Sequence, residues 1–371
     1  MPQTANEHLL NEQIAHQVDL QRYSTAVVRR MMGLLNRADS DLFLQLQLVI
    51  DQLDSTNFSV ERLSLLLAQV RTLNTAAYLT IERELATELQ GLVDVESAAQ
   101  LELFKAAAPA SIGVSFTQIV PDQVAAAAYT QPFRGRLLRE WTASLEAERM
   151  VRIRDAVRLG IVENETNQQI INRIRGTRAN NYADGIIQID RRNAEAVVRT
   201  AVSHVAGATR DAMYQNNADL IKAIVWVSTL DARTTEPCRI RDGLKYSSDG
   251  RYKPIGHRVP WLSGPGRLHW RCRSSSVPVM KSWQELGAEA SELTAGERAS
   301  MDGQLPAETT YGQWIKKQSA ARQDEILGPT RAKLMREGKL EFDQLYTDRG
   351  RPLTLDELRA RRPQAFGQAG L

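Results

Sequence analysis

The 371-residue sequence predicts a mainly α-helical protein with a small α+β, loop-rich domain in its second half. Ala, Leu, Arg and Gln are plentiful, which favours helices. Apolar residues also recur at helical spacing, as at Val60, Leu63 and Leu67. At residue 220 this periodicity gives way to the β-rich run IKAIVWVSTL, followed by a stretch rich in Gly, Pro, Asp and Ser, which predicts short strands joined by long loops.

The sequence divides into four expected segments. Residues 1–106 form an N-terminal helical region of long antiparallel helices. Residues 107–133 are interrupted by prolines and form an irregular connection with a short helix at PDQVAAAAY. Residues 134–281 contain helices and then a strand-and-loop clasp at 220–281, and residues 282–371 form a helical C-terminal segment.

Local signals mark several helix ends. Ser59 precedes an apolar helical face and is a candidate N-cap. Thr166 and Thr354 each stand three residues before a Gln or Glu, the spacing of a capping box. Gly160 and Gly176 are expected to end their helices, because glycine is preferred just past a helix C-terminus.

Composition narrows the class of protein. The chain has no uninterrupted apolar run near the roughly 18 residues that a transmembrane helix needs. Its N-terminus lacks the basic and apolar regions of a secretory signal. Two cysteines do not make a disulfide framework, so a reducing compartment is expected.

Charge is unevenly distributed along the chain. Residues 1–130 carry 8 Lys and Arg against 15 Asp and Glu, a net charge of −7, whereas residues 231–281 carry 11 against 4, a net charge of +7. The basic segment is a candidate contact for nucleic acid or for an acidic protein face, and a solvated basic surface is the alternative. Its candidate contact residues are Arg239, Arg241, Lys245, Arg251, Lys253, Arg258, Arg267 and Arg271.

Both cysteines fall in the 220–281 region. Cys238, His269 and Cys272 are zinc-type ligands, and His-x-x-Cys is a usable ligand spacing. A structural zinc site is almost always four-coordinate, so a fourth ligand is needed, and Asp231 or His257 are the candidates.

Two other interpretations remain open for this region. In the first, a Cys/His pair is catalytic, with Arg271 and Arg273 lowering the pKa of Cys272. In the second, which the residues favour, the region is a structural clasp: Asp231 braces the turn after the strand, Arg233 pairs with it or with a backbone carbonyl, and Gly243 takes a positive φ. The clasp residues are Trp226, Asp231, Arg233, Thr234, Gly243 and Arg273.

An ordered series of motifs resembles the signature of the phage Mu F-like minor head proteins, also called head morphogenesis proteins. The upstream run RRNAEAVVRTAVSHVAGATRDAMY is similar to that family's Arg-Thr helix, and the resemblance covers roughly residues 130–360. Where the family often has Cys-Arg-Cys, this chain has Cys272, Arg273 and Ser274, which weakens the zinc interpretation. The matching positions are Trp226, Asp231, Arg233, Thr234, Cys238, Gly243, Pro260, His269, Cys272, Arg273 and Pro278.

The resemblance implies a non-enzymatic role without a required cofactor. A minor head protein would join the procapsid with the portal, capsid or scaffold protein, contact double-stranded DNA and leave with it. It would be found inside the virion head, and in the host cytoplasm during assembly. The alternative is a zinc-dependent nuclease or hydrolase using the Cys/His cluster, with His257 or His269 as base, or an effector carried in the virion.

Overall fold

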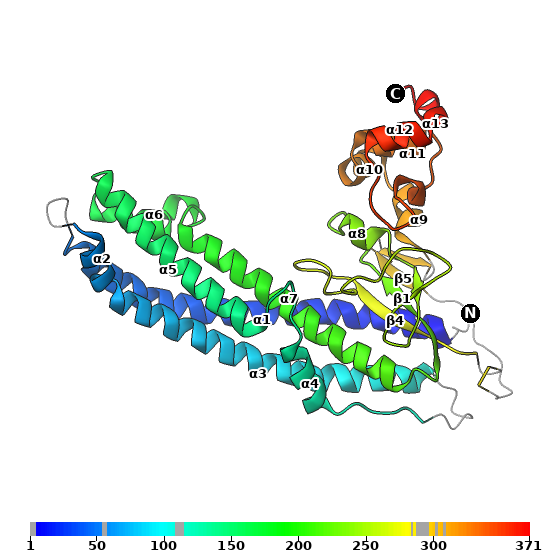
Figure 1. Cartoon of the computed structure of the whole chain (residues 1–371), viewed down its shortest axis with the longest axis horizontal. Coiled ribbons are helices and arrows are strands. Elements are labelled where there is room, and N and C mark those ends of the chain that lie inside the picture. The colour runs from blue at the N-terminus through cyan, green and yellow to red at the C-terminus, as the bar shows by residue number, and fades with distance from the viewer. Residues whose placement is uncertain are drawn as a thin grey trace. The chain divides into compact units, whose positions relative to one another are not determined.

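The computed structural model describes residues 5–53, 58–107, 115–282, 285–286, 297–300, 303–306 and 309–371 (Figure 1). The fold is mainly α, as predicted, with 64% of the chain in helices and 7% in strands. Within the described residues, none of the helices is long and apolar enough to span a bilayer.

The chain forms two compact units, and neither is a continuous stretch of sequence. Unit 1 consists of residues 1–21, 94–124 and 206–371, and unit 2 of residues 22–93 and 125–205. The long helices α1 (Ala5–Ile50), α3 (Ala68–Ala107) and α7 (Ile186–Asn216) each contribute to both units. The predicted boundaries at 106, 133 and 281 therefore describe segments of sequence, and their independence stays a prediction.

Unit 2 is a helical bundle. It contains α5 (Leu138–Val162), α6 (Asn167–Arg175), the short α2 (Val60–Leu66) and η1 (Arg178–Asn180), and the adjoining stretches of α1, α3 and α7 (Figure 1). The predicted short helix at PDQVAAAAY is present as α4 (Pro121–Thr130). One apolar cluster joins α1, α2, α3, α5, α6 and α7, and its fully buried members include Leu42, Leu46, Leu63, Val70, Ile153, Val157, Ile170 and Ile174.

Buried ion pairs cross the same bundle. Arg149 and Arg191 both donate to the carboxylate of Asp39, and the side chains of Arg149 and Asp39 are 1% and 4% exposed. Arg152 donates to Asp190, whose second carboxylate oxygen is buried without a hydrogen-bond partner. Burial outweighs Arg152 and raises the pKa of Asp190 to about 6.

Most predicted helix ends in unit 2 are confirmed. Ser59 caps α2, Thr166 forms a capping box with Gln169 at the start of α6, and Gly176 ends α6 at a φ of 93°. The prediction for Gly160 is wrong, because α5 continues past it to Val162. A Cβ at this position would lie 2.5 Å from Cγ1 of Ile170, so the glycine permits close approach of α6 rather than ending the helix.

Unit 1 contains the predicted clasp, a four-stranded antiparallel sheet in the order β3-β2-β1-β4. The strands are β1 (Ile221–Val227), β2 (Lys245–Tyr246), β3 (Pro254–Ile255) and β4 (Ser275–Met280), with the short helix α8 (Glu236–Arg239) between β1 and β2. The start of α1 lies beside β4, where Gln13 donates to the Ser275 hydroxyl and the Asn6 side chain accepts from Met280 N (Figure 1).

The C-terminal part of unit 1 is helical apart from one hairpin. β5 (Glu297–Ser300) pairs with β6 (Gly303–Pro306), a hairpin that the prediction of a helical C-terminal segment did not include. Most of the helix predicted at SWQELGAEASELT lies outside the described residues.

Five short helices and a 3₁₀ turn, η2 (Phe342–Leu345), follow the hairpin and gather beside α8 in Figure 1. Thr354 forms the predicted capping box with Glu357, and Gly350 in the predicted turn has a φ of 76°. Their shared core includes Leu230 at the end of the clasp strand, together with Tyr311, Trp314 and Phe366. The helices are α9 (Tyr311–Lys316), α10 (Ala320–Leu327), α11 (Pro329–Arg336), α12 (Leu355–Arg361) and α13 (Pro363–Gln368).

Candidate functional site

Asp231 braces the turn that follows β1. Its Oδ1 accepts from the backbone nitrogens of Arg233 and Thr234 at 3.1 and 3.0 Å. Arg273 donates to both carboxylate oxygens at 2.5 and 2.8 Å. Burial alone raises the pKa of Asp231, but the hydrogen bonds from Arg273 outweigh it, and the net pKa is lowered.

Asp231 has a closer partner than the predicted Arg233. Arg233 is 84% exposed and its nearest approach to the carboxylate is 3.9 Å, so it is a weak surface neighbour. Arg273 is the main partner of Asp231 instead. It lies just before β4, and the pairing of β1 with β4 brings it alongside the turn. Strand pairing over this distance has no local sequence signal.

A second buried acid was not anticipated from the sequence. Asp242 accepts from Ser228 N at 2.6 Å and from Tyr311 N at 2.7 Å, and so links the end of β1 to the start of α9. Gly243 follows it with a φ of 79°, as predicted, and donates to Trp226 O. In the sequence, the dipeptide Asp242-Gly243 indicates a turn. It does not indicate that Asp242 accepts hydrogen bonds from Ser228 and Tyr311.

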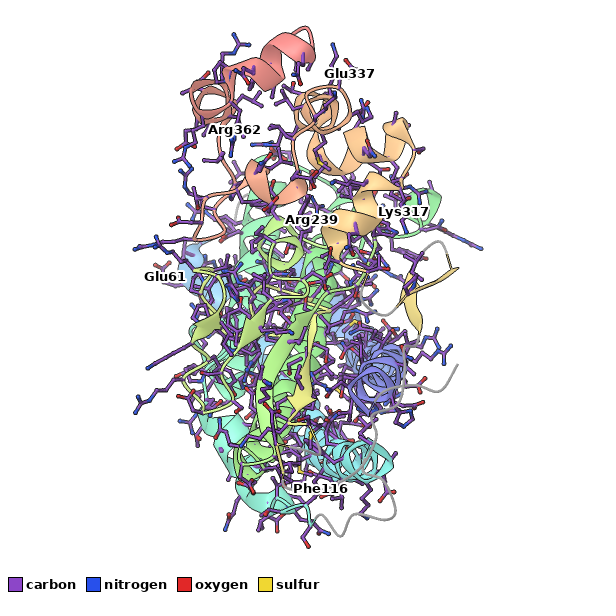
Figure 2. The ribbon with its side chains drawn as sticks, turned by 90° about the vertical axis from the view of Figure 1, so that its right-hand side faces the viewer. Glu61, Phe116, Arg239, Lys317, Glu337 and Arg362 are labelled. Carbon is purple, nitrogen blue, oxygen red and sulfur yellow. The ribbon has the colours of Figure 1, made fainter. Side chains whose placement is uncertain are left out.

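The basic candidates separate into buried and exposed groups. Arg239, labelled in Figure 2, donates to the carbonyls of Thr234 and Ile326, and Arg241 donates to those of Pro237 and Pro260. Both are nearly fully buried, and Arg267 pairs with Asp211. These three arginines therefore hold the clasp together, and their guanidinium groups do not form a surface for nucleic acid.

The exposed candidates lie mostly on one hairpin. Lys245, Arg251, Lys253 and Arg258 are exposed along residues 245–258, which contain the paired strands β2 and β3. We call residues 245–258 the basic hairpin; it carries these four basic side chains and one acid, Asp249. Arg271, outside the hairpin, is also exposed.

Aromatic side chains form a small core beneath the hairpin. Trp226 is fully buried, and its ring lies 5.3 Å from that of Trp261. Tyr246 and Tyr252 pack on Trp261 at 4.8 and 4.6 Å between ring centroids. Trp270 is only partly buried. Aromatic burial of this kind anchors short strands that have few aliphatic residues.

The two cysteines and His269 meet at one point. Cys238 Sγ, on α8, lies 3.7 Å from Cys272 Sγ and 3.2 Å from His269 Nε2. The three ligand atoms lie within 4.8 Å of one another. The hydrogen bond to the Cys238 thiol lowers the pKa of Cys272, and the same contact together with burial raises the pKa of Cys238.

Neither proposed fourth ligand belongs to this cluster. Within the described part of the chain, the group of potential metal ligands contains Cys238, His269 and Cys272 alone. The Asp231 carboxylate is occupied by Arg273, and His257 directs Nε2 to Lys245 O at 2.8 Å while its ring packs on Tyr246. The prediction of Asp231 or His257 as fourth ligand is therefore wrong in geometry.

The geometry gives little support to catalysis. Both cysteines are 1% exposed, so a substrate does not reach either sulfur, as a nucleophile would require. A zinc hydrolase also needs a base beside the metal-bound water. Among the described residues, the cluster includes no carboxylate for that purpose.

One comparison with known proteins bears on this region. Residues 151–277 match the family model described as phage Mu protein F like protein, and this match confirms the resemblance seen in the sequence. The matched residues amount to roughly a third of the chain and include β1, the basic hairpin and all three cluster residues. No curated protein and no solved structure matches the chain.

Proposed function

We propose that this protein is a phage minor head protein, a non-enzymatic virion component that associates with the portal protein during procapsid assembly. The observation that carries the proposal is the match of residues 151–277 to the phage Mu F-like family, which suggests a head morphogenesis protein. The helical segments bind the portal, capsid or scaffold protein. The protein assembles in the host cytoplasm and is retained inside the head.

Co-purification tests the assembly role. The full chain is co-expressed with the portal, capsid and scaffold proteins encoded beside it, and each is tested in a pull-down. Proteomics of purified procapsids and virions is done in parallel. We expect retention by the portal protein and a low copy number in both particles. Absence from both particles together with no binding to the portal would contradict the proposal.

The basic hairpin is the proposed DNA contact. Its exposed side chains present positive charge on a short, paired loop, and phosphate contacts of this kind are independent of sequence. Removing three such contacts lowers the salt dependence of binding, because each contributes about 0.9 to the slope of log K against log salt. This contact is separate from the assembly role, and the head protein is proposed whether or not DNA is bound.

Matched charge variants test the DNA contact. The triple variant Lys245→Gln, Arg251→Gln, Lys253→Gln is compared with Arg71→Gln, Arg139→Gln, Arg158→Gln, which removes the same charge from exposed positions in unit 2. We expect the first variant to reduce the salt slope by about 2–3 and the second to change it little. Equal effects of the two variants would assign binding to net charge and remove the hairpin from the proposal.

A further inference from the structure

The cysteine–histidine cluster has the dimensions of a zinc site. A tetrahedral zinc ion, with Zn–S near 2.3 Å and Zn–N near 2.0–2.1 Å, holds neighbouring ligand atoms about 3.5–3.8 Å apart. Cys238 Sγ is 3.7 Å from Cys272 Sγ and 3.2 Å from His269 Nε2. These two separations lie within about half an ångström of the tetrahedral values, and all three ligand atoms lie within 4.8 Å of one another.

The imidazole of His269 is already in the required tautomer. Its Nδ1 lies 2.9 Å from the carbonyl oxygen of Trp270. A carbonyl can only accept, so Nδ1 carries the hydrogen and the lone pair is on Nε2, which faces the sulfur of Cys238. A backbone carbonyl on the distal nitrogen is the usual second partner of a metal-bound histidine.

The backbone around the cluster is fixed by contacts that do not involve the ligands. Arg239 ties α8 to the carbonyl of Ile326, and Arg241, just after α8, donates to that of Pro260. The pair Asp231–Arg273 ties the turn after β1 to the residue following Cys272. The ligand set is thus held before any ion arrives, which reduces the ordering that binding requires.

From these contacts we propose that Cys238, His269 and Cys272 bind one Zn²⁺ ion, with a water molecule held by the Thr235 hydroxyl as the fourth ligand. The Thr235 hydroxyl lies 2.9 Å from His269 Nε2, on the partly buried side of the cluster. As zinc binds, the thiols release their protons to solvent. The ion joins α8 to the segment before β4 and is structural. The inference is independent of the proposed role in head assembly.

Ser274 offers a variant that strengthens the site. Its hydroxyl bonds to the Cys238 sulfur and lies 3.2 Å from the Ser228 hydroxyl. A thiolate at this position would replace the water as fourth ligand. Ser274→Cys is therefore expected to raise zinc affinity by about 10-fold or more, because four protein ligands close the site. A misfolded variant would bind zinc more weakly, so misfolding does not explain a gain in zinc affinity.

The test uses the full chain purified under reducing conditions. Metal content is measured by plasma mass spectrometry, and Co²⁺ is titrated into the metal-free protein to detect thiolate-to-cobalt absorption. We expect one zinc per chain and a cobalt spectrum with two thiolates. Cys272→Ser and His269→Ala should lower affinity by ~100-fold or more. His257→Ala, a histidine outside the cluster, should leave it unchanged.

Three results would overturn the proposal. The first is a wild-type protein that binds neither metal although its circular dichroism shows that it is folded. The second is a Cys272→Ser variant that binds zinc as tightly as the wild type. The third is a disulfide between Cys238 and Cys272 under reducing conditions, detected by intact mass as the loss of two hydrogens. The cobalt titration is done on the wild-type protein, so it tests the proposal even if a variant fails to fold.

Discussion

The bundle of unit 2 and the clasp of unit 1 are stabilised in different ways. The bundle buries a continuous apolar cluster, whose members recur along each helix at helical spacing. The clasp has short strands, and its turns are held by buried polar groups: the carboxylates of Asp231 and Asp242 and the guanidinium groups of Arg239 and Arg241. The bundle thus combines a large apolar cluster with a few buried ion pairs, whereas the clasp combines a small aromatic core with many polar partners that hold its turns.

The largest effect is expected in the bundle. Ile153→Ala removes a fully buried side chain from the apolar cluster and should lower the free energy of unfolding by about 3 kcal/mol. Val151→Ala on the same helix, at a side chain that is 44% exposed, should change it by less than about 0.5 kcal/mol. Urea unfolding followed by circular dichroism measures both. Similar losses would contradict the assignment of stability to buried area.

The clasp is expected to respond next. Asp231→Asn keeps the shape of the side chain but removes the charge that Arg273 and the turn amides contact, and should cost about 2 kcal/mol. Arg233→Ala removes the exposed neighbour and should cost less than about 0.5 kcal/mol. Hydrogen exchange of the turn peptide reports the difference. If Arg233→Ala opens the turn as much as Asp231→Asn, the brace has been assigned to the wrong arginine.

Acidification should act in opposite directions in the two regions. The pKa of Asp190 is raised to about 6, above the unfolded value near 3.9, so its protonated form favours the folded bundle. Lowering the pH from 7 to 5 should stabilise the bundle by about 1 kcal/mol, and Asp190→Asn should abolish this dependence.

The pKa of Asp231 is lowered, so its contribution is present above the unfolded value and is lost as the pH falls through the folded value. The clasp should therefore weaken only below about pH 4. Thermal unfolding between pH 3 and 7, followed by exchange of peptides from each region, measures both trends. If acidification changed the stability of both regions in the same direction, the raised pKa of Asp190 and the lowered pKa of Asp231 would be contradicted.

The smallest effect concerns one helix end. Thr166→Ala removes the side chain that accepts from Gln169 N and should cost about 1 kcal/mol or less, with faster exchange limited to α6. Thr166→Ser keeps the acceptor oxygen and should restore most of the loss. A loss spread over the whole bundle would show that the cap has more than a local role.

The sequence predicted the features that depend on near neighbours. The caps at Ser59, Thr166 and Thr354 were predictable because each acts within three residues. Gly160 was misassigned because its contact with Ile170 belongs to a different helix. The partners of Arg239 were not predictable either, since one of them, Ile326, is 87 residues away.

The same distinction applies to the candidate site. The residue types and the His-x-x-Cys spacing indicated Cys238, His269 and Cys272, and the structure brings them together. The fourth position was misassigned because Asp231 and His257 are taken by Arg273 and the Lys245 carbonyl. Which partner a side chain binds depends on the groups that the fold brings near it, and composition and spacing do not predict those groups.

Because both units are discontinuous in sequence, they become complete at different times during synthesis of the chain. Unit 2 is complete once residue 205 has emerged from the ribosome, whereas unit 1 joins residues 1–21 to residues that are translated after residue 205. Gln13 contacts Ser275 across 262 residues of chain, so the start of α1 is made long before the strand beside which it packs. Domains tend to fold as they emerge, and long-range pairing is slow. During synthesis, all residues of unit 2 are therefore available for folding before those of unit 1.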